Sequence, residues 1–281
     1  MAFKRWRHPK KTFESSQSSQ ESFNSPEPRN QQDESINKPS TSRGEEIYEV
    51  TMAKGIIDTE FISIIHAKEN IIYSAAMLVQ DENGYIETMP YLYYNCNEEN
   101  LKWPDRKKRL FNQFKMSNAD IVCLQEVDAD YYYNTYLSYF QSQGYDGVFK
   151  QKTQEKIDGC VTFFKKCEFS LKEDHSLEML KNGIDLLNRD NIALISILTP
   201  FKNPDKQICI VNTHLLYNRK REDVRLAQLQ VLLAEINRVA CKNTNYPPVI
   251  LCGDLNFTPS SKLYSFLSQG RLKYEHLDIK N

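Results

Sequence analysis

Short apolar runs that end abruptly in polar residues are the feature that most constrains this chain. The run 249–252 lies between a proline pair and Gly253, and Asp254 and Asn256 follow directly. Four apolar residues bounded by turn signals are typical of a fully buried strand, whose end delivers polar side chains to the mouth of a sheet. Two residues apart, Asp254 and Asn256 point to the same side. Such a pair suits holding a water against a phosphate near a metal ion, although turn and cap chemistry is the commoner explanation.

Similar runs recur along the chain between segments with helical spacing. Strands are predicted at 119–127, 145–150, 159–164, 191–198, 207–211 and 249–252, with irregular candidates at 61–65 and 70–79. Helices are predicted at 103–116, 131–140, 222–240 and 261–267. Strands outnumber helices and both kinds are buried, which favours sheets packed together with helices outside.

The first 55 residues differ in composition from the rest. A basic start is followed by Ser, Gln, Asn, Glu and Pro with hardly an aliphatic residue, a composition that cannot offset its ordering entropy. We therefore expect a disordered tail at 1–55 and a globular domain at 56–281. The basic start could be a nuclear or mitochondrial address or an RNA contact, but Glu14 and Glu21 weaken the transit-peptide interpretation. A solvated tail is the favoured interpretation.

Charge and cysteine usage narrow the class of protein. A net charge of -1 gives no global attraction to nucleic acid or membrane, so any basic surface must be local. The seven cysteines include no Cys-x-x-Cys pair, and Cys123, Cys209 and Cys252 lie inside apolar runs. This pattern predicts buried free thiols rather than zinc ligands or a disulfide framework. No run reaches a membrane span, so we expect no membrane partner and a cytoplasmic protein, with the nucleus as an alternative.

Polar groups at the ends of predicted strands form the candidate site. They are Glu126, Asp158, His214, Asp254 and Asn256. Each has an ordinary structural explanation when taken alone: a solvated strand end or cap, a turn, or a satisfied histidine. Together they contain the parts that metal-assisted phosphodiester hydrolysis requires, because carboxylate oxygen suits Mg²⁺, which keeps several waters and takes few protein ligands.

Five motifs, in order and spacing, resemble the endonuclease/exonuclease/phosphatase superfamily. They are Leu-Gln-Glu-Val at 124–127, Asp-Gly-Cys at 158–160, Leu-Asn-Arg-Asp-Asn at 187–191, Asn-Thr-His-Leu-Leu-Tyr at 212–217 and Cys-Gly-Asp-Leu-Asn at 252–256. Within that superfamily the sequence is most similar to the Ccr4-type deadenylase branch and its Angel homologues. The similarity extends from about Tyr73 to Tyr274.

The resemblance implies a fold, a cofactor and a set of roles. The fold is a four-layer α/β sandwich of two mixed β-sheets flanked by helices. Glu126 would be the metal ligand for Mg²⁺, with Mn²⁺ as an alternative ion, and Asp254 and Asn256 would handle water and phosphate. The scissile phosphate would contact His214, while Asp158 and Asn191 would line the substrate side. The partners implied are RNA 3′ ends, with mRNA-decay or translation factors.

Two departures from the family pattern affect the expected activity. The opening strand of the family carries an Asn that helps to hold the metal, and Ala76 stands at the aligned position. The family also closes with an Asp-His segment, and this sequence ends at Asn281 before it. We therefore expect a sandwich that is truncated and incomplete at its C-terminus, with weak or no hydrolytic activity for the chain as given.

Two functional hypotheses follow from these observations. The first is a Mg²⁺-dependent phosphodiesterase that acts on RNA 3′ ends, either as a 3′-5′ exoribonuclease (deadenylase) or on terminal 2′,3′-cyclic phosphates. The second is a pseudoenzyme that binds RNA or a protein partner through the retained groove. Ala76 favours the second, because a substitution in the middle of a motif is not explained by truncation.

Overall fold

Two β-sheets organise the chain in this computed structural model, which describes residues 102–218, 220–242 and 246–273 and the backbone of strands at 49–51, 62–63 and 72–76. The five-stranded sheet has the order β2 (Ile62–Ser63), β10 (Val249–Asp254), β9 (Ile208–His214), β8 (Ile192–Pro200) and β7 (Phe169–Glu178). The four-stranded sheet has the order β3 (Ile72–Ala76), β4 (Ile121–Asp128), β6 (Asp158–Lys165) and β5 (Tyr145–Gln151). Each sheet contains parallel and antiparallel pairs, so the prediction of two mixed sheets is confirmed.

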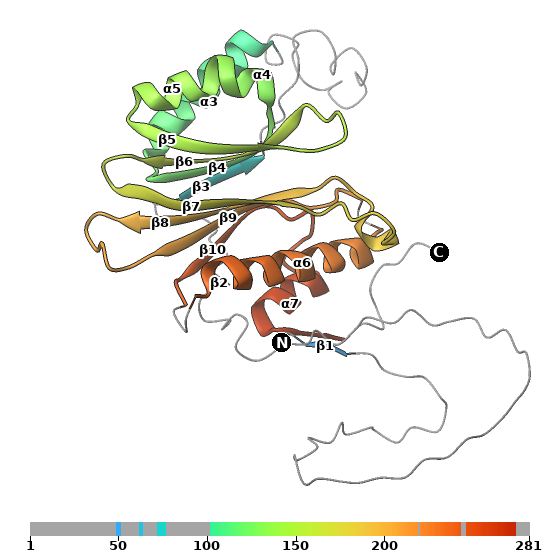
Figure 1. Ribbon diagram of the computed structural model, residues 1–281. Helices are drawn as coiled ribbons and strands as arrows, with labels where there is room; N and C mark the ends of the chain where they lie inside the picture. Colours follow the sequence, from blue (N-terminus) through green and yellow to red (C-terminus); the bar gives the residue numbers. More distant parts are fainter. Residues whose placement is uncertain are drawn as a thin grey trace, which may run out of the picture. The chain divides into compact units, whose positions relative to one another are not determined.

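Helices cover the outer face of each sheet (Figure 1). Against the four-stranded sheet pack α3 (Trp103–Ser117), α4 (Ala129–Tyr131), the π-helical segment η3 (Tyr132–Tyr136) and α5 (Leu137–Ser142). Against the five-stranded sheet pack α6 (Glu222–Ala240) and α7 (Lys262–Gln269). A short 3-10 helix, η4 (Asp185–Leu187), precedes β8, and β1 (Glu49–Thr51) pairs with β11 (Arg271–Lys273). The predicted four-layer arrangement is therefore confirmed.

Alternation along the central strands separates the core into layers. In β4, Val122 and Leu124 contact the helices, whereas Ile121 and Cys123 join the cluster between the two sheets. This is the two-residue periodicity of a strand that is buried on both faces. Cys123, Cys209 and Cys252 are buried free thiols, as the apolar runs predicted.

Local signals explain where the helices begin and end. Helix α3 has proline in its first turn and ends at Asn118, a left-handed residue whose N–H donates to the Phe114 carbonyl (3.1 Å). Helix α7 begins after Ser261, whose hydroxyl accepts from the N–H of Tyr264 (3.1 Å), and it stops at Gly270. Within the described parts of the chain, no helix has both the length and the apolar character needed to cross a membrane.

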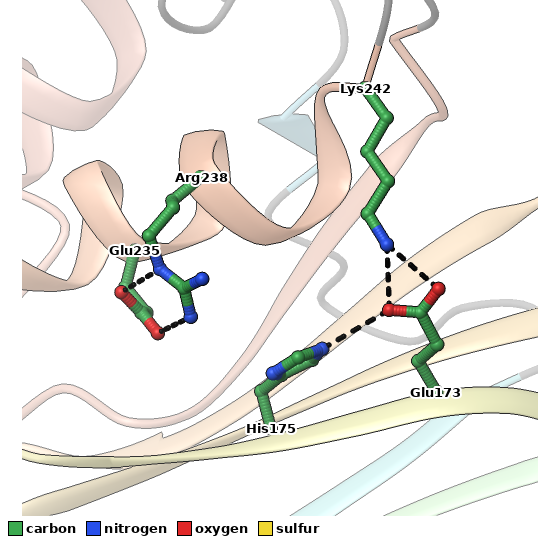
Figure 2. A network of polar contacts seen from close by, with 5 residues as sticks. All are labelled: Glu173, His175, Glu235, Arg238 and Lys242. Atoms are coloured by element: carbon green, nitrogen blue, oxygen red, sulfur yellow. Dashed lines mark hydrogen bonds and ion pairs between the residues drawn. The ribbon is translucent and has the colours of Figure 1, made fainter.

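Strand β7 was not predicted from the sequence. It is an edge strand in which exposed polar or charged residues alternate with more buried ones. Its sequence therefore lacks the apolar run of a buried strand. Figure 2 shows the contacts on its outer, helix-covered face: Glu173 accepts hydrogen bonds from Lys242, at 2.7 Å to each oxygen, and lies 3.3 Å from His175 Nε2. Lys242 lies two residues after the end of α6, so this ion pair joins the edge strand to the helix that covers the sheet.

A buried amide bridge links the two sheets. Asn212 of β9 is fully buried, and its Nδ2 donates to the carbonyls of Leu124 (3.1 Å) and Val161 (2.9 Å) in β4 and β6. Its Oδ1 accepts from Gln125 Nε2 at 2.7 Å. Because each polar group that the bridge buries has a partner, the bridge carries little desolvation cost and fixes how the sheets face each other.

The predicted domain boundary at residue 55 stays a prediction. Strand β1 lies inside the segment expected to be a tail, and the residues before it lie outside the described part of the chain.

We predict that Asn212→Leu lowers the free energy of unfolding by about 3 kcal/mol or more, because the buried carbonyls of Leu124 and Val161 and the Gln125 amide would each lose one hydrogen bond. For a domain of this size the melting temperature should fall by roughly 6 to 12 °C. The exposed Asn203→Leu is the matched control and should melt close to the unmodified protein. Equal melting of the two variants would contradict a stabilising role for the bridge.

Candidate functional site

Strand register brings four of the predicted groups to one end of the sandwich. Strands β9 and β10 are parallel, and His214 is the register partner of Asp254. Both residues therefore lie at the same end of the five-stranded sheet. On the facing sheet, Glu126 lies near the end of β4, and Asp158 begins the antiparallel strand β6. His214 Nε2 lies 3.9 Å from Glu126 Oε1, which places the two sheets' contributions side by side.

The position of Glu126 differs from the simple expectation. It lies inside β4 rather than beyond the strand, at a bulge where the register with β6 shifts between Leu124 and Val127. Its φ of 57° is in the left-handed region, which is strained for a residue other than glycine. Bulges of this kind change the direction of a side chain. Asp158 is likewise the first residue of a strand and not a residue after one.

The Asp254–Asn256 pair lies in a tight turn and is held there by hydrogen bonds. Gly253 precedes it at a φ of 142°, where an added Cβ would approach the Thr213 carbonyl oxygen to 1.9 Å, so only glycine fits. The N–H of Asn256 donates to Asp254 Oδ1 (3.0 Å), and its Nδ2 donates to the Leu215 carbonyl (2.9 Å). These bonds hold the carboxylate and the carboxamide in one fixed arrangement beside His214.

Burial and neighbouring charges set the protonation of the site. Burial raises the pKa of Glu126; Lys152 opposes this rise, and the carboxylates of Asp158 and Asp254 add to it. Burial also lowers the pKa of His214, with a further lowering by Lys152, so the neutral imidazole is favoured at pH 7. The His214 Nδ1 atom is buried without a hydrogen-bond partner among the described residues.

Lys152 is a site residue that sequence reasoning missed. It follows β5, and its Nζ lies 2.5 Å from Asp158 Oδ2, with only 14% of its side chain exposed. The lysine supplies the positive charge that acts on both Glu126 and His214. No motif marks it, because one lysine beside a predicted turn looks like any solvated surface lysine.

Asn191 contacts the backbone of His214. It is buried directly before β8, its Nδ2 donates to the His214 carbonyl (2.8 Å), and its Oδ1 accepts from Gln228 Nε2 (2.8 Å). The structure thus brings Asn191 to His214 by a backbone contact. Its predicted place on the substrate side stays a prediction.

Ala76 lies beside Glu126, the predicted metal ligand, in strand register. It ends β3, where it pairs with Gln125, the residue before Glu126. The position where the resemblance predicts an Asn is therefore next to Glu126 in this chain. Alanine has no atom that can bind a metal or form a side-chain hydrogen bond.

The groups at this end of the sandwich fit a weakly liganded Mg²⁺. Among the residues that the structure describes, no group of three or more His, Cys, Asp or Glu side chains is arranged to hold a metal. Mg²⁺, however, keeps several waters and needs only one or two carboxylates. Glu126 has oxygen ligands of the right kind; burial, the first cause, raises its pKa, and the nearby carboxylates of Asp158 and Asp254 add to this rise, which a bound cation would offset.

Comparison with known proteins agrees with this geometry. The sequence profile of the Endonuclease/Exonuclease/phosphatase family matches residues 92–278. The chain belongs to this family.

Relatives place the chain near the Angel homologues and the Ccr4-type branch, as predicted. Protein angel homolog 2 of Danio rerio is 43% identical over 193 residues, which cover 67% of this chain and 34% of that protein. Carbon catabolite repressor protein 4 homolog 3 of Arabidopsis thaliana is 31% identical over 243 residues, which cover 86% of this chain and 52% of that protein. The chain thus spans about a third to a half of the length of these two relatives.

A solved structure gives the same fold. The crystal structure of ANGEL2, a 2′,3′-cyclic phosphatase, in complex with adenosine-2′,3′-vanadate matches with a TM-score of 0.68 and 39% identity. The match covers 73% of this chain and 59% of that chain.

We predict that Glu126→Gln raises the melting temperature, and that the gain grows with pH. A raised pKa in the folded state gives stability that is fully present below the usual value of 4.5 and is lost as pH rises through the folded pKa. Glutamine does not ionise, so the variant keeps this stability as pH rises. Thermal melts of the metal-free protein from pH 4.5 to 7 measure the difference, with the exposed Glu155→Gln as control. A constant difference across this range would show that burial does not perturb Glu126.

We also predict that Lys152→Met raises the pKa of His214 toward its usual value of 6.5, because the lysine charge lowers it. An NMR titration of the imidazole protons without metal measures this shift. The exposed Lys156→Met should leave the titration unchanged. No shift in the Lys152 variant would mean that its charge does not act on His214.

Proposed function

We propose that the site hydrolyses phosphoester bonds at RNA 3′ ends with Mg²⁺, at a rate reduced by Ala76. The observation that carries this proposal is the meeting of Glu126, Asp254 and His214, from two different sheets, at one end of the sandwich. Family membership supports phosphoester chemistry. The likeness to ANGEL2, described as a 2′,3′-cyclic phosphatase, favours a terminal cyclic phosphate over an adenylated end as substrate.

Each side chain has a role that its surroundings support. Asp254, held by the N–H of Asn256, would orient and deprotonate the attacking water. A neutral His214 can donate one N–H to a non-bridging phosphate oxygen without adding a charge. Glu126 would hold the Mg²⁺ or Mn²⁺, which when bound supplies positive charge against the phosphoryl oxygen. The Lys152–Asp158 pair would present a cation and a carboxylate on the substrate side.

Ala76 supports a second candidate, a binding protein with a disabled site. The strand register puts this residue next to Gln125 and so beside Glu126, the proposed metal ligand. Losing one member of a catalytic unit commonly costs several powers of ten in rate, while binding through the remaining groups survives. The expected cytoplasmic or nuclear location and the mRNA-decay or translation partners remain predictions.

The test compares the unmodified protein, Glu126→Ala and Ala76→Asn on two RNAs, one with a 2′,3′-cyclic phosphate and one with a 3′ adenylate tail. With Mg²⁺ or Mn²⁺ we expect slow turnover, a loss of about 100-fold or more in Glu126→Ala, and a gain of about 10-fold in Ala76→Asn.

Binding of the same RNAs separates the two candidates. Tight binding with no turnover in the unmodified protein and in Ala76→Asn would favour the binding protein. A rate that Glu126→Ala leaves unchanged would contradict the assigned site.

A further inference from the structure

Helix α6 carries a polar side chain where its packing calls for an apolar one. Gln228 is fully buried beside Leu229 and Leu232, which belong to the core cluster under the five-stranded sheet. Burying an amide without partners would cost a few kcal/mol, so its contacts show why it is there. Both ends of its amide are engaged, and both contacts lead to the strand end that carries His214.

The contacts of Gln228 have only one possible direction. The backbone N–H of Leu216 can only donate, so the oxygen of Gln228 must accept it (3.0 Å). The Nε2 of Gln228 must then donate to Asn191 Oδ1 (2.8 Å), which leaves Asn191 Nδ2 to donate to the His214 carbonyl (2.8 Å). The hydrogen bonds close a ring through the backbone from His214 to Leu216.

Further hydrogen bonds connect this ring to Asp254 and Asn256. Leu215, inside the ring, donates its N–H to the Asp254 carbonyl (2.9 Å) and accepts from Asn256 Nδ2 (2.9 Å). A single backbone segment is therefore fixed from one side by Gln228 and Asn191, and from the other by the Asp254–Asn256 pair. Movement of this segment would displace His214 relative to Asp254, and misplacing a reacting group by about 1 Å can cost roughly 100-fold in rate.

We propose that Gln228 is a positioning residue, which orients Asn191 and thereby sets the position of His214 against the phosphate. The proposal rests on the proposed function for its kinetic consequence. Gln228 does not touch the substrate, so its removal should act on the chemical step and leave substrate affinity nearly unchanged. A purely structural amide in the core would lower stability alone.

The test uses Gln228→Met, Asn191→Leu and the double variant. Gln228→Met keeps the size of the side chain and removes both hydrogen bonds, and Gln230→Met, a half-buried residue on the same helix, is the matched control. We expect kcat to fall about 10- to 100-fold in each single variant with KM within about twofold, as for groups that orient a site from behind. The double variant should be no slower than the slower single variant, because the two residues act as one unit.

An NMR measurement without substrate decides the proposal even if no variant turns over RNA. In the unmodified protein the Asn191 side-chain amide should show slow hydrogen exchange and a coupling through its hydrogen bond to the His214 carbonyl. In Gln228→Met the exchange should accelerate and the imidazole signals of His214 should shift, whereas Gln230→Met should change neither.

Unchanged Asn191 and His214 signals in Gln228→Met would overturn the proposal, as would equal falls in kcat for Gln228→Met and Gln230→Met.

If Gln228→Met does not fold, the coupling in the unmodified protein and the kcat and KM of Asn191→Leu decide. An absent coupling, or a KM that rises with kcat unchanged, would overturn it. Signals that shift as expected in a protein without turnover would support the positioning ring and contradict the proposed function alone.

Discussion

The contact of Asn212 with three groups of the opposite sheet is the interaction on which the site depends. An apolar interface between sheets allows small shifts of one sheet against the other, whereas directed hydrogen bonds to two carbonyls and one amide permit a single arrangement. The residues that matter lie one or two positions away: Gln125 precedes Glu126, and Asn212 is two residues before His214. The distance between the Glu126 carboxylate and the His214 imidazole is therefore set by the hydrogen bonds of Asn212 in the core.

Much of the fold could be predicted because its buried elements follow simple periodicity. The helix at 222–240 and the strands that end at the site were recognised from apolar spacing and turn residues. Strand β7 was missed because its exposed and edge positions permit Glu173, Asp174 and His175, which interrupt any apolar pattern. The bulge at Glu126 also has no sequence signal, because its φ depends on the partner strand.

The candidate site was predictable only in part, for a physical reason. Glu126, His214 and Asp254 stand at strand ends, so their convergence follows from topology. Lys152 acts on Glu126 and His214, and Gln228 on Asn191, residues that lie far from them in the sequence, and the residues that flank Lys152 and Gln228 give no sign of these contacts. A glutamine directly before Leu229 in the apolar spacing of α6 is the available signal for Gln228. It gains meaning only when the partner strand is known.

The parallel pairing of β9 with β10 has a consequence for how the protein folds. Parallel neighbours need a crossover, here α6, so His214 and Asp254 become neighbours only after the whole segment between them has closed. Glu126 must join from the other sheet, through contacts that span 87 and 88 residues. During synthesis, a chain that has not yet released β10 from the ribosome cannot contain the assembled site. The arrangement of these three groups would therefore form in a single step, after β10 has been synthesised.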